Sequence, residues 1–207
     1  MAARIRIVIA DDHAIVRGAI RPLLEEQRGV QIVGEAEDGM TAIALTKALQ
    51  PDILVLDVSL PHASGIVVMN EVQRWSPNTR VIVLTGIAKA AVLAQLAHSG
   101  AAGILLKSCS TQELVCGFRS VLSGDQYIAV EAREAMATES LLSQLTPRES
   151  QILSFALQGR TNAEIAAALH ISQKTADNHR TNLMRKLNVH SITELTLLAS
   201  RAGLLDY

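Results

Sequence analysis

Four short apolar stretches in this chain each end in side chains that suit phosphoryl-transfer chemistry. The side chains are Asp11 and Asp12 after residues 5–10, Asp57 after residues 53–56, Thr85 after residues 81–84 and Lys107 after residues 103–106. Several carboxylates together bind a divalent cation such as Mg²⁺, and an aspartate can attack phosphorus to form an acyl phosphate. A lysine and a threonine could hold the remaining phosphate oxygens. The set predicts a phosphoryl-accepting site, although each residue by itself could equally be a solvated strand end.

An alternation of strands and helices would bring these residues together. The pattern predicts strands at roughly residues 5–10, 31–35, 52–56, 80–84 and 103–106, and helices at roughly 13–27, 39–49, 64–74, 88–98 and 111–122. Short apolar runs separated by helices are typical of a parallel sheet that is covered on both faces. Because the site in such a sheet lies at the carboxyl ends of the strands, we expect an α/β fold with a five-stranded, parallel, doubly wound sheet and all five side chains on one edge.

The pattern changes after residue 122. Residues 123–143 are mostly polar or small, which predicts a linker with one short helix near residues 131–138. Residues 144–207 are expected to be all-α, because helix-starting patterns recur at Thr146, Thr161, Ser172 and Ser191. The tight joint at residues 170–172 indicates a helix-turn-helix within a four-helix domain.

The helix after this joint carries a polar face that favours DNA binding over an ordinary small helical bundle. The exposed residues of this face are expected to be Gln173, Lys174, Asn178, Arg180, Thr181 and Arg185. Residues 145–190 also carry 6 basic against 3 acidic residues, whereas residues 1–130 carry 11 against 12. A modest basic excess beside a polar helix face indicates a nucleic-acid partner.

The composition is that of a packed globular protein, with 49% hydrophobic residues, 19% charged residues and a formal net charge of −1. Cys109 and Cys116 match no zinc or CxxC spacing, so we expect reduced thiols in a cytoplasmic protein. Asp11 and Asp12 interrupt the first apolar stretch, and polar residues interrupt residues 88–106. We therefore expect neither a signal peptide nor a membrane span.

These motifs resemble those of a known family. Residues 1–122 resemble the receiver domain of bacterial two-component response regulators, through IVIADDHAIVRGAI, DILVLDVSLPHASGI, VIVLTG and GAAGILLKS. Residues 144–207 resemble the LuxR-type helix-turn-helix domain, through LTPRESQIL, GRTNAEIAAALHIS and KTADNHRTNLMRKL. The order of the two is that of the NarL/FixJ class. The resemblance implies a flavodoxin-like receiver, a linker and a DNA-binding domain.

The resemblance also implies roles in the receiver. Asp57 would accept a phosphoryl group from a sensor histidine kinase, and Thr85 and Lys107 would respond to the phosphate. Asp12 would ligate Mg²⁺ directly and Asp11 through water, and the Ser59 carbonyl would complete the protein ligands. The chemistry of the chain would be limited to self-phosphorylation and self-dephosphorylation at Asp57, so it would not be a metabolic enzyme.

In the second domain, the resemblance places Gln173, Lys174, Thr175, Asn178 and Arg180 against the major groove of double-stranded DNA. The expected function is a transcription regulator that is switched by phosphorylation and forms a homodimer, with RNA polymerase as a further candidate partner and no membrane partner. The dimer surface is left open between the last helix, with Leu195, Leu198 and Ala199, and the receiver. The alternatives are a regulator whose receiver acts through phosphate-independent protein or ligand contacts, and a relay module that does not bind DNA.

Two positions depart from the family pattern. Ile104 stands on the fifth strand where many receivers have an aromatic residue, which puts the usual rotamer coupling in doubt. Ala176-Asp177 stands where many relatives have Val-Lys. The Asp177 carboxylate would either face DNA and accept from a cytosine amino group, or point to solvent.

Overall fold

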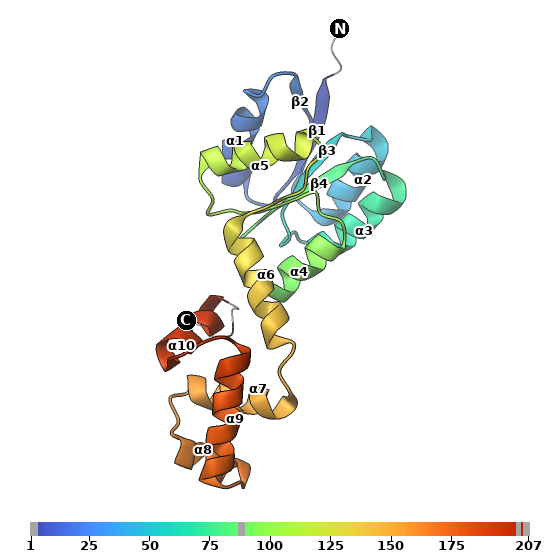
Figure 1. The fold of residues 1–207 in the computed structure, drawn as a ribbon. Helices are drawn as coiled ribbons and strands as arrows, with labels where there is room; N and C mark the ends of the chain where they lie inside the picture. Colours follow the sequence, from blue (N-terminus) through green and yellow to red (C-terminus); the bar gives the residue numbers. More distant parts are fainter. Residues whose placement is uncertain (1–3, 87–89, 202–203, 205–207) are drawn as a thin grey trace. The chain divides into compact units, whose positions relative to one another are not determined.

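A computed structural model describes residues 4–86, 90–201 and 204 of the chain. The chain forms two compact units, with the boundary inside helix α6 (Val130–Leu142), between Arg133 and Glu134. The first unit contains a parallel sheet with helices on both of its faces, and the second contains helices only, as the sequence predicted (Figure 1).

The sheet of the first unit has the strand order β2-β1-β3-β4-β5-β6, and all of its neighbouring strands pair in parallel. Its strands are β1 (Ile5–Ala10), β2 (Val30–Ala36), β3 (Ile53–Leu56), β4 (Arg80–Thr85), β5 (Gly103–Leu106) and β6 (Tyr127–Ile128). The strands β1, β3, β4 and β5 occupy the middle of the sheet and are almost entirely buried, because helices cover both faces. The four strands whose ends carry the predicted site are therefore consecutive neighbours.

Helices cover both faces of this sheet (Figure 1). They are α1 (Ala14–Glu25), α2 (Gly39–Leu49), α3 (Gly65–Trp75), α4 (Ala90–His98) and α5 (Thr111–Leu122). The core on the α1 and α5 side contains Ile20, Leu24 and Phe118, which pack against Ile7 and Ile9 of β1. The predicted start of the fourth helix at residue 88 lies outside the described residues.

The structure differs from the prediction most in residues 123–143. Tyr127–Ile128 forms β6, which pairs with β5 as a sixth strand. Helix α6 spans Val130–Leu142, more than the predicted short helix. A two-residue strand has no readable periodicity, and its pairing partner is supplied by a distant part of the chain. The segment expected to be a linker is thus mostly regular structure.

The second unit contains α7 (Pro147–Leu157), α8 (Asn162–Leu169), α9 (Gln173–Lys186) and α10 (Ile192–Arg201). Its core includes Ile152, Ile165, Leu183 and Leu195, one from each helix. In the described residues, no helix combines the length and the apolar character needed to cross a bilayer.

The capping patterns explain where these helices begin. Thr146 and Thr161 each form a complete capping box, with Glu149 and Glu164 respectively. Ser191 Oγ accepts a hydrogen bond from the Glu194 N–H, but the Glu194 side chain accepts from the His190 N–H rather than that of Ser191. At the helix start predicted at Ser191, the reciprocal hydrogen bond to Glu194 therefore comes from His190, one residue earlier than in a capping box.

Candidate functional site

The predicted site residues lie at one edge of the sheet, because each ends or directly follows a central strand. Asp11 follows β1, Asp57 follows β3, Thr85 is the last residue of β4 and Lys107 follows β5. The Asp57 N–H donates to the Ala10 carbonyl at 2.8 Å, and the Lys107 N–H donates to the Thr85 carbonyl at 2.8 Å. Strand pairing itself therefore brings these residues together.

Asp57 is a buried carboxylate at the centre of this edge, with 2% of its surface exposed. Its Oδ2 accepts a hydrogen bond from the Lys107 Nζ at 2.8 Å, and its Oδ1 accepts one from the Ser59 N–H at 3.2 Å. A buried charge is costly unless it is paired and hydrogen-bonded, and both conditions are met here. A carboxylate oxygen held in this way is a competent nucleophile for an electrophilic phosphorus.

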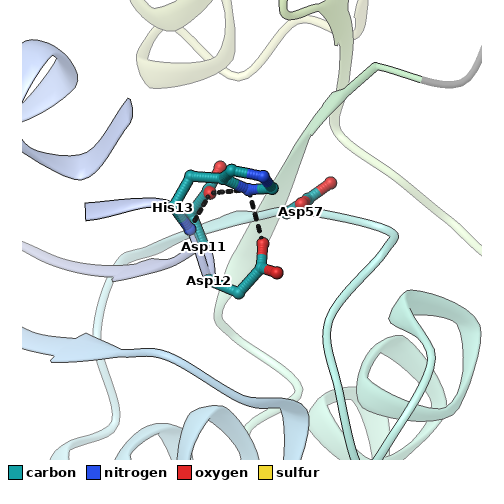
Figure 2. A group of neighbouring side chains, drawn as sticks. All are labelled: Asp11, Asp12, His13 and Asp57. Atoms are coloured by element: carbon teal, nitrogen blue, oxygen red, sulfur yellow. Dashed lines mark hydrogen bonds and ion pairs between the residues drawn. The ribbon is translucent and has the colours of Figure 1, made fainter. Parts of the chain in front are cut away.

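Asp11 and Asp12 form an acidic loop beside Asp57 (Figure 2). Asp11 is buried and Asp12 is exposed, and His13 lies next to both. The His13 N–H donates to Asp11 Oδ1 at 2.8 Å, and its Nδ1 lies 2.7 Å from Asp12 Oδ1. The sequence pointed to the two aspartates but not to His13, although it directly follows them.

The donor set of this loop fits a divalent cation. One ligand atom from each of Asp11, Asp12, His13 and Asp57 lies within 4.8 Å of the others. The buried Asp11 Oδ2 accepts no hydrogen bond from any described residue, and it lies 2.8 Å from the Lys107 Nζ as an ion pair. Mg²⁺ prefers a small number of carboxylate oxygens and retains several water ligands, which this partly open site allows.

Lys107 is the cationic member of the site. Its Nζ lies 2.8 Å from both Asp11 Oδ2 and Asp57 Oδ2. Burial lowers the pKa of the Lys107 ammonium, but its close contacts with the Asp11 and Asp57 carboxylates outweigh this effect, so the pKa lies above its ordinary value. Lys107 therefore stays charged and can pair with a phosphate oxygen as well as with a carboxylate.

Two further positions on β4 and β5 matter for any movement at this edge. Thr85 is fully buried, and it pairs with Leu106 in the β4–β5 register. Ile104 is also fully buried, between Val83 and Ile128 on the neighbouring strands. An aliphatic side chain enclosed in this way cannot make the large rotation of an exposed aromatic ring.

In the second unit, α9 is joined to α7 by an ion pair between the exposed Lys186 and the buried Glu149. Glu149, which is 6% exposed, accepts a hydrogen bond from the Lys186 Nζ at 2.7 Å and one from the Thr146 N–H at 2.8 Å. The hydrogen bond from Lys186, those from Thr146 and the charge of Lys186 lower the pKa of Glu149 to about 2. This contact joins the start of α7 to the end of α9.

The polar face predicted on α9 is present. Gln173, Lys174, Asn178, Thr181 and Arg185 are exposed, and Arg180 is half-buried. Ala176, Leu183 and Leu187 point into the core, which leaves that face unobstructed within the unit. The spacing of the exposed residues follows the helical period, so they lie along one side of the helix.

Thr175 and Asp177 are engaged differently from what the sequence suggested. The Thr175 N–H and hydroxyl both contact Ser172 Oγ, so Thr175 contributes to the cap of α9. Asp177 is exposed, as one of the two interpretations expected, but its Oδ1 accepts a hydrogen bond from the Asn162 Nδ2 at 2.8 Å. Neither interpretation included this contact with α8.

Comparisons with known proteins agree with the geometry in both units. Residues 7–119 match the family described as the response regulator receiver domain, and residues 143–199 match bacterial regulatory proteins of the luxR family. The response regulator UvrY of Escherichia coli K12 is 36% identical over 208 residues, covering 97% of this chain and 95% of UvrY. The chain belongs to the response regulators of the NarL/FixJ class.

Other response regulators are similar over nearly the whole chain. The oxygen regulatory protein NreC of Staphylococcus carnosus is 33% identical over 216 residues, covering 98% of this chain and 100% of NreC. The structure of the response regulator RcsB bound to DNA is 29% identical, with a TM-score of 0.64, covering 96% of this chain and 98% of RcsB. Another RcsB structure contains two dimers bound to two parallel DNAs. This chain is thus a two-component response regulator with a receiver and a LuxR-type DNA-binding domain.

Proposed function

We propose that Asp57 accepts a phosphoryl group from the histidine of a sensor kinase, and that this modification controls DNA binding by α9. The observation that carries the proposal is the buried Asp57 carboxylate, which meets Lys107 and the acidic loop at the carboxyl edge of the sheet. We assign the phosphoacceptor function to residues 1–122, the linker to residues 123–143 and DNA binding to residues 144–207.

The carboxylates of Asp11, Asp12 and Asp57, with the Ser59 carbonyl, would hold Mg²⁺, which when bound neutralises charge on the transferred group. An Asp57 oxygen attacks phosphorus while the bond from phosphorus to the kinase histidine breaks. Lys107 then pairs with a phosphate oxygen and the Thr85 hydroxyl hydrogen-bonds to another. The same site can take phosphate from a small donor and lose it to water, which limits its chemistry to self-phosphorylation and self-dephosphorylation.

The link from the phosphate to the rest of the receiver runs through β4 and β5. Thr85 and Lys107 are joined by a backbone hydrogen bond, so a shift of either residue toward phosphate displaces both strand ends. Such a shift changes the population of two receiver conformations rather than creating a new one. Because the enclosed Ile104 side chain cannot make the large rotation of an aromatic ring, we assign to Thr85 the coupling between the phosphate and the rest of the receiver.

On the DNA-binding domain, we propose that α9 enters the major groove. Its proposed contact residues are Gln173, Lys174, Thr175, Asn178, Arg180, Thr181 and Arg185. The RcsB–DNA structure supports this assignment, since it shows a similar chain bound to DNA. Because the contacts are largely cationic and polar, the affinity should fall steeply with salt concentration.

We propose that the phosphorylated protein is a homodimer that reads two half-sites about one helical turn apart, or a multiple of that. Leu195 and Ala199, in the stripe considered from sequence, are fully buried in the domain core, and Leu198 packs against it. The outer face of α10 instead exposes Ile192 (41%) and Leu197 (54%). This face, with receiver surfaces as the rival, is the dimer contact we favour, and RNA polymerase is a candidate partner of the DNA-bound dimer.

The test is incorporation of phosphate from acetyl phosphate with Mg²⁺, detected as an added mass on the intact protein. We expect wild-type protein to be modified and Asp57→Asn to remain unmodified. Asp52→Asn is the matched control, because Asp52 lies before the opposite end of the same strand and should leave labelling unchanged. Labelling of Asp57→Asn would place the acceptor elsewhere, and no labelling of the wild type would favour the phosphate-independent regulator.

A further inference from the structure

Asn162 connects α8 to two side chains of α9. Its Nδ2 donates to Asp177 Oδ1 at 2.8 Å, and its Oδ1 accepts from the Arg180 Nη1 at 3.0 Å. Asp177 and Arg180 are three residues apart on α9 and therefore lie on the same side of that helix. Asn162 itself is the first residue of α8 and is half-buried. The three side chains form one hydrogen-bonded chain: carboxylate, carboxamide, guanidinium.

The chemistry of the three groups fixes the orientation of the carboxamide. An ionised carboxylate only accepts hydrogen bonds and a guanidinium only donates them. The Asn162 Nδ2 must therefore face Asp177, and its Oδ1 must face Arg180. Without the Asp177 acceptor, the amide loses the partner of its donor side, and only the hydrogen bond from Arg180 then holds the carboxamide in this orientation.

This arrangement restricts Arg180. Its side chain is half-buried, and one of its five N–H donors is held by Asn162. An arginine side chain loses considerable rotamer freedom when it is fixed, and a scaffold that fixes it in advance removes that cost from binding. The remaining N–H groups stay available for a bidentate contact with guanine or a phosphate.

We propose that Asn162 is a positioning residue for Arg180 in DNA recognition, and that Asp177 acts on DNA binding through Asn162 rather than by touching the DNA. The inference rests on the proposed role of Arg180 as a DNA contact. Asp177 then contributes to DNA recognition by holding the Asn162 carboxamide. The Asp177 carboxylate on α9 is therefore favourable for sequence-specific binding.

The two possible effects of Asp177 have opposite signs. A carboxylate that acts only through its charge repels phosphates, so its removal should strengthen binding to every duplex equally. A carboxylate that positions Arg180 contributes to the contact with the correct base, so its removal should weaken binding to the preferred sequence. The ratio of affinities for the preferred and a mixed sequence separates the two effects.

The experiment uses the full-length protein with Mg²⁺ and acetyl phosphate. The probes are a duplex of about 20 base pairs selected by this protein from a randomised pool, which spans two half-sites, and a mixed-sequence duplex of the same length. For Asp177→Ala, we expect the ratio of the two affinities to fall about tenfold, the size of one good base contact. Tighter binding to both duplexes with an unchanged ratio would overturn the proposal.

A second experiment repeats Asp177→Ala in protein that lacks the Arg180 side chain, to test whether Asp177 affects DNA binding through Arg180. In protein that already carries Arg180→Ala, Asp177→Ala should leave the affinity ratio unchanged, because the side chain to be positioned is gone. An equal loss of ratio in both backgrounds would show that Asp177 contacts DNA independently and would contradict the inference.

A double variant exchanges the carboxamide of α8 and the carboxylate of α9, so that both groups and the net charge are kept. Asn162→Asp combined with Asp177→Asn puts the carboxylate on α8, where it can accept from Arg180 and from the carboxamide on α9. We expect this pair to restore most of the ratio that Asp177→Ala loses. If the exchange variant is folded by circular dichroism but no better than Asp177→Ala, hydrogen-bond positioning is the wrong explanation.

Lys174→Ala separates this inference from the proposed function. If Lys174→Ala and Arg180→Ala both weaken DNA binding while Asp177→Ala leaves the ratio intact, α9 binds DNA but the positioning role is wrong. If neither Lys174→Ala nor Arg180→Ala affects DNA binding, α9 does not bind DNA. Both the proposed DNA contact of α9 and the positioning role of Asn162 are then overturned.

Discussion

Arg17 is a buried cation that supports the acidic loop from α1. Its Nη1 donates to the Asp11 carbonyl at 2.7 Å, and its guanidinium is paired with Glu37 and lies 3.4 Å from Glu35. The Arg17 side chain is 10% exposed, whereas those of Glu35 and Glu37 are 31% and 73% exposed. Arg17 is therefore expected to hold the backbone that presents Asp11 and Asp12.

For Arg17→Met, we expect a loss of about 1–3 kcal/mol in unfolding free energy, because the buried Asp11 carbonyl loses its hydrogen-bond donor. Urea unfolding monitored at Trp75 measures this. Arg21→Met is the matched control, since Arg21 is an exposed residue of the same helix that pairs with Glu25 and Glu35. Exposed ion pairs contribute little, so the control should lose much less. Equal losses would show that Arg17 has no special supporting role.

Glu149 gives the DNA-binding domain a specific pH dependence. Its pKa is about 2 in the folded protein, below the ordinary value of 4.5, because Lys186 and Thr146 donate hydrogen bonds to its carboxylate. A depressed pKa contributes stability above pH 4.5 that is lost as the pH falls toward 2. This part of the stability comes from the contact between α7 and α9 that Glu149 and Lys186 form.

We expect Glu149→Gln to be less stable than wild type above pH 4.5, and the difference to shrink as the pH falls toward 2. The measurement is denaturant unfolding followed by NMR signals of α7 and α9 at several pH values. Glu164→Gln provides the comparison, because Glu164 occupies the same position of an exposed capping box without a lysine partner. A pH-independent difference for Glu149→Gln would contradict the assigned ion pair.

At the scale of elements, the start of α3 packs directly against the segment that follows Asp57. A Cβ on Gly65 would lie 2.8 Å from the Val58 Cα and 3.3 Å from the Asp57 carbonyl oxygen. Both atoms belong to the backbone and cannot rotate away. The absence of a side chain at Gly65 therefore sets how closely α3 approaches the phosphoryl site.

We expect Gly65→Ala to lower the melting temperature of the receiver and to slow phosphorylation of Asp57, because the clash moves backbone at the site. Calorimetry and the labelling rate with acetyl phosphate measure the two effects. Gly18→Ala is the control: a Cβ there meets no atom within 4 Å, so the change should stabilise α1 by up to about 1 kcal/mol. Unchanged stability and labelling in Gly65→Ala would mean that α3 can shift without cost.

At the scale of the whole molecule, phosphorylation and dimerisation should be linked. Light scattering with Mg²⁺ and acetyl phosphate should detect a shift from monomer to dimer in wild type and none in Asp57→Asn. Leu197→Glu should be phosphorylated normally but remain monomeric, since it places a charge on the exposed apolar face of α10. If Leu197→Glu still forms a dimer, the receiver surfaces rather than α10 make the dimer contact.

The sequence by itself determined the features that depend on chain order and local contacts. Asp57 and Lys107 could be assigned to one edge because residues that follow parallel strands must meet there, whatever the details of packing. Thr146 and Thr161 could be assigned as helix starts because a capping box involves only four consecutive residues. The exposed face of α9 followed from its helical period.

Only the tertiary structure decided the contacts between segments that are distant in sequence. No local sequence pattern indicates the pairing of β6 with β5 or the hydrogen bond from Arg17 to the Asp11 carbonyl. The same is true of the hydrogen bonds of Asn162 to Asp177 and Arg180. Asn162 lies 15 residues before Asp177 and 18 before Arg180, so their contact exists only because α8 packs against α9. Hydrogen bonds across such packing depend on side-chain positions that periodicity does not encode, which is why the sequence identified Asp177 as unusual but not its partner.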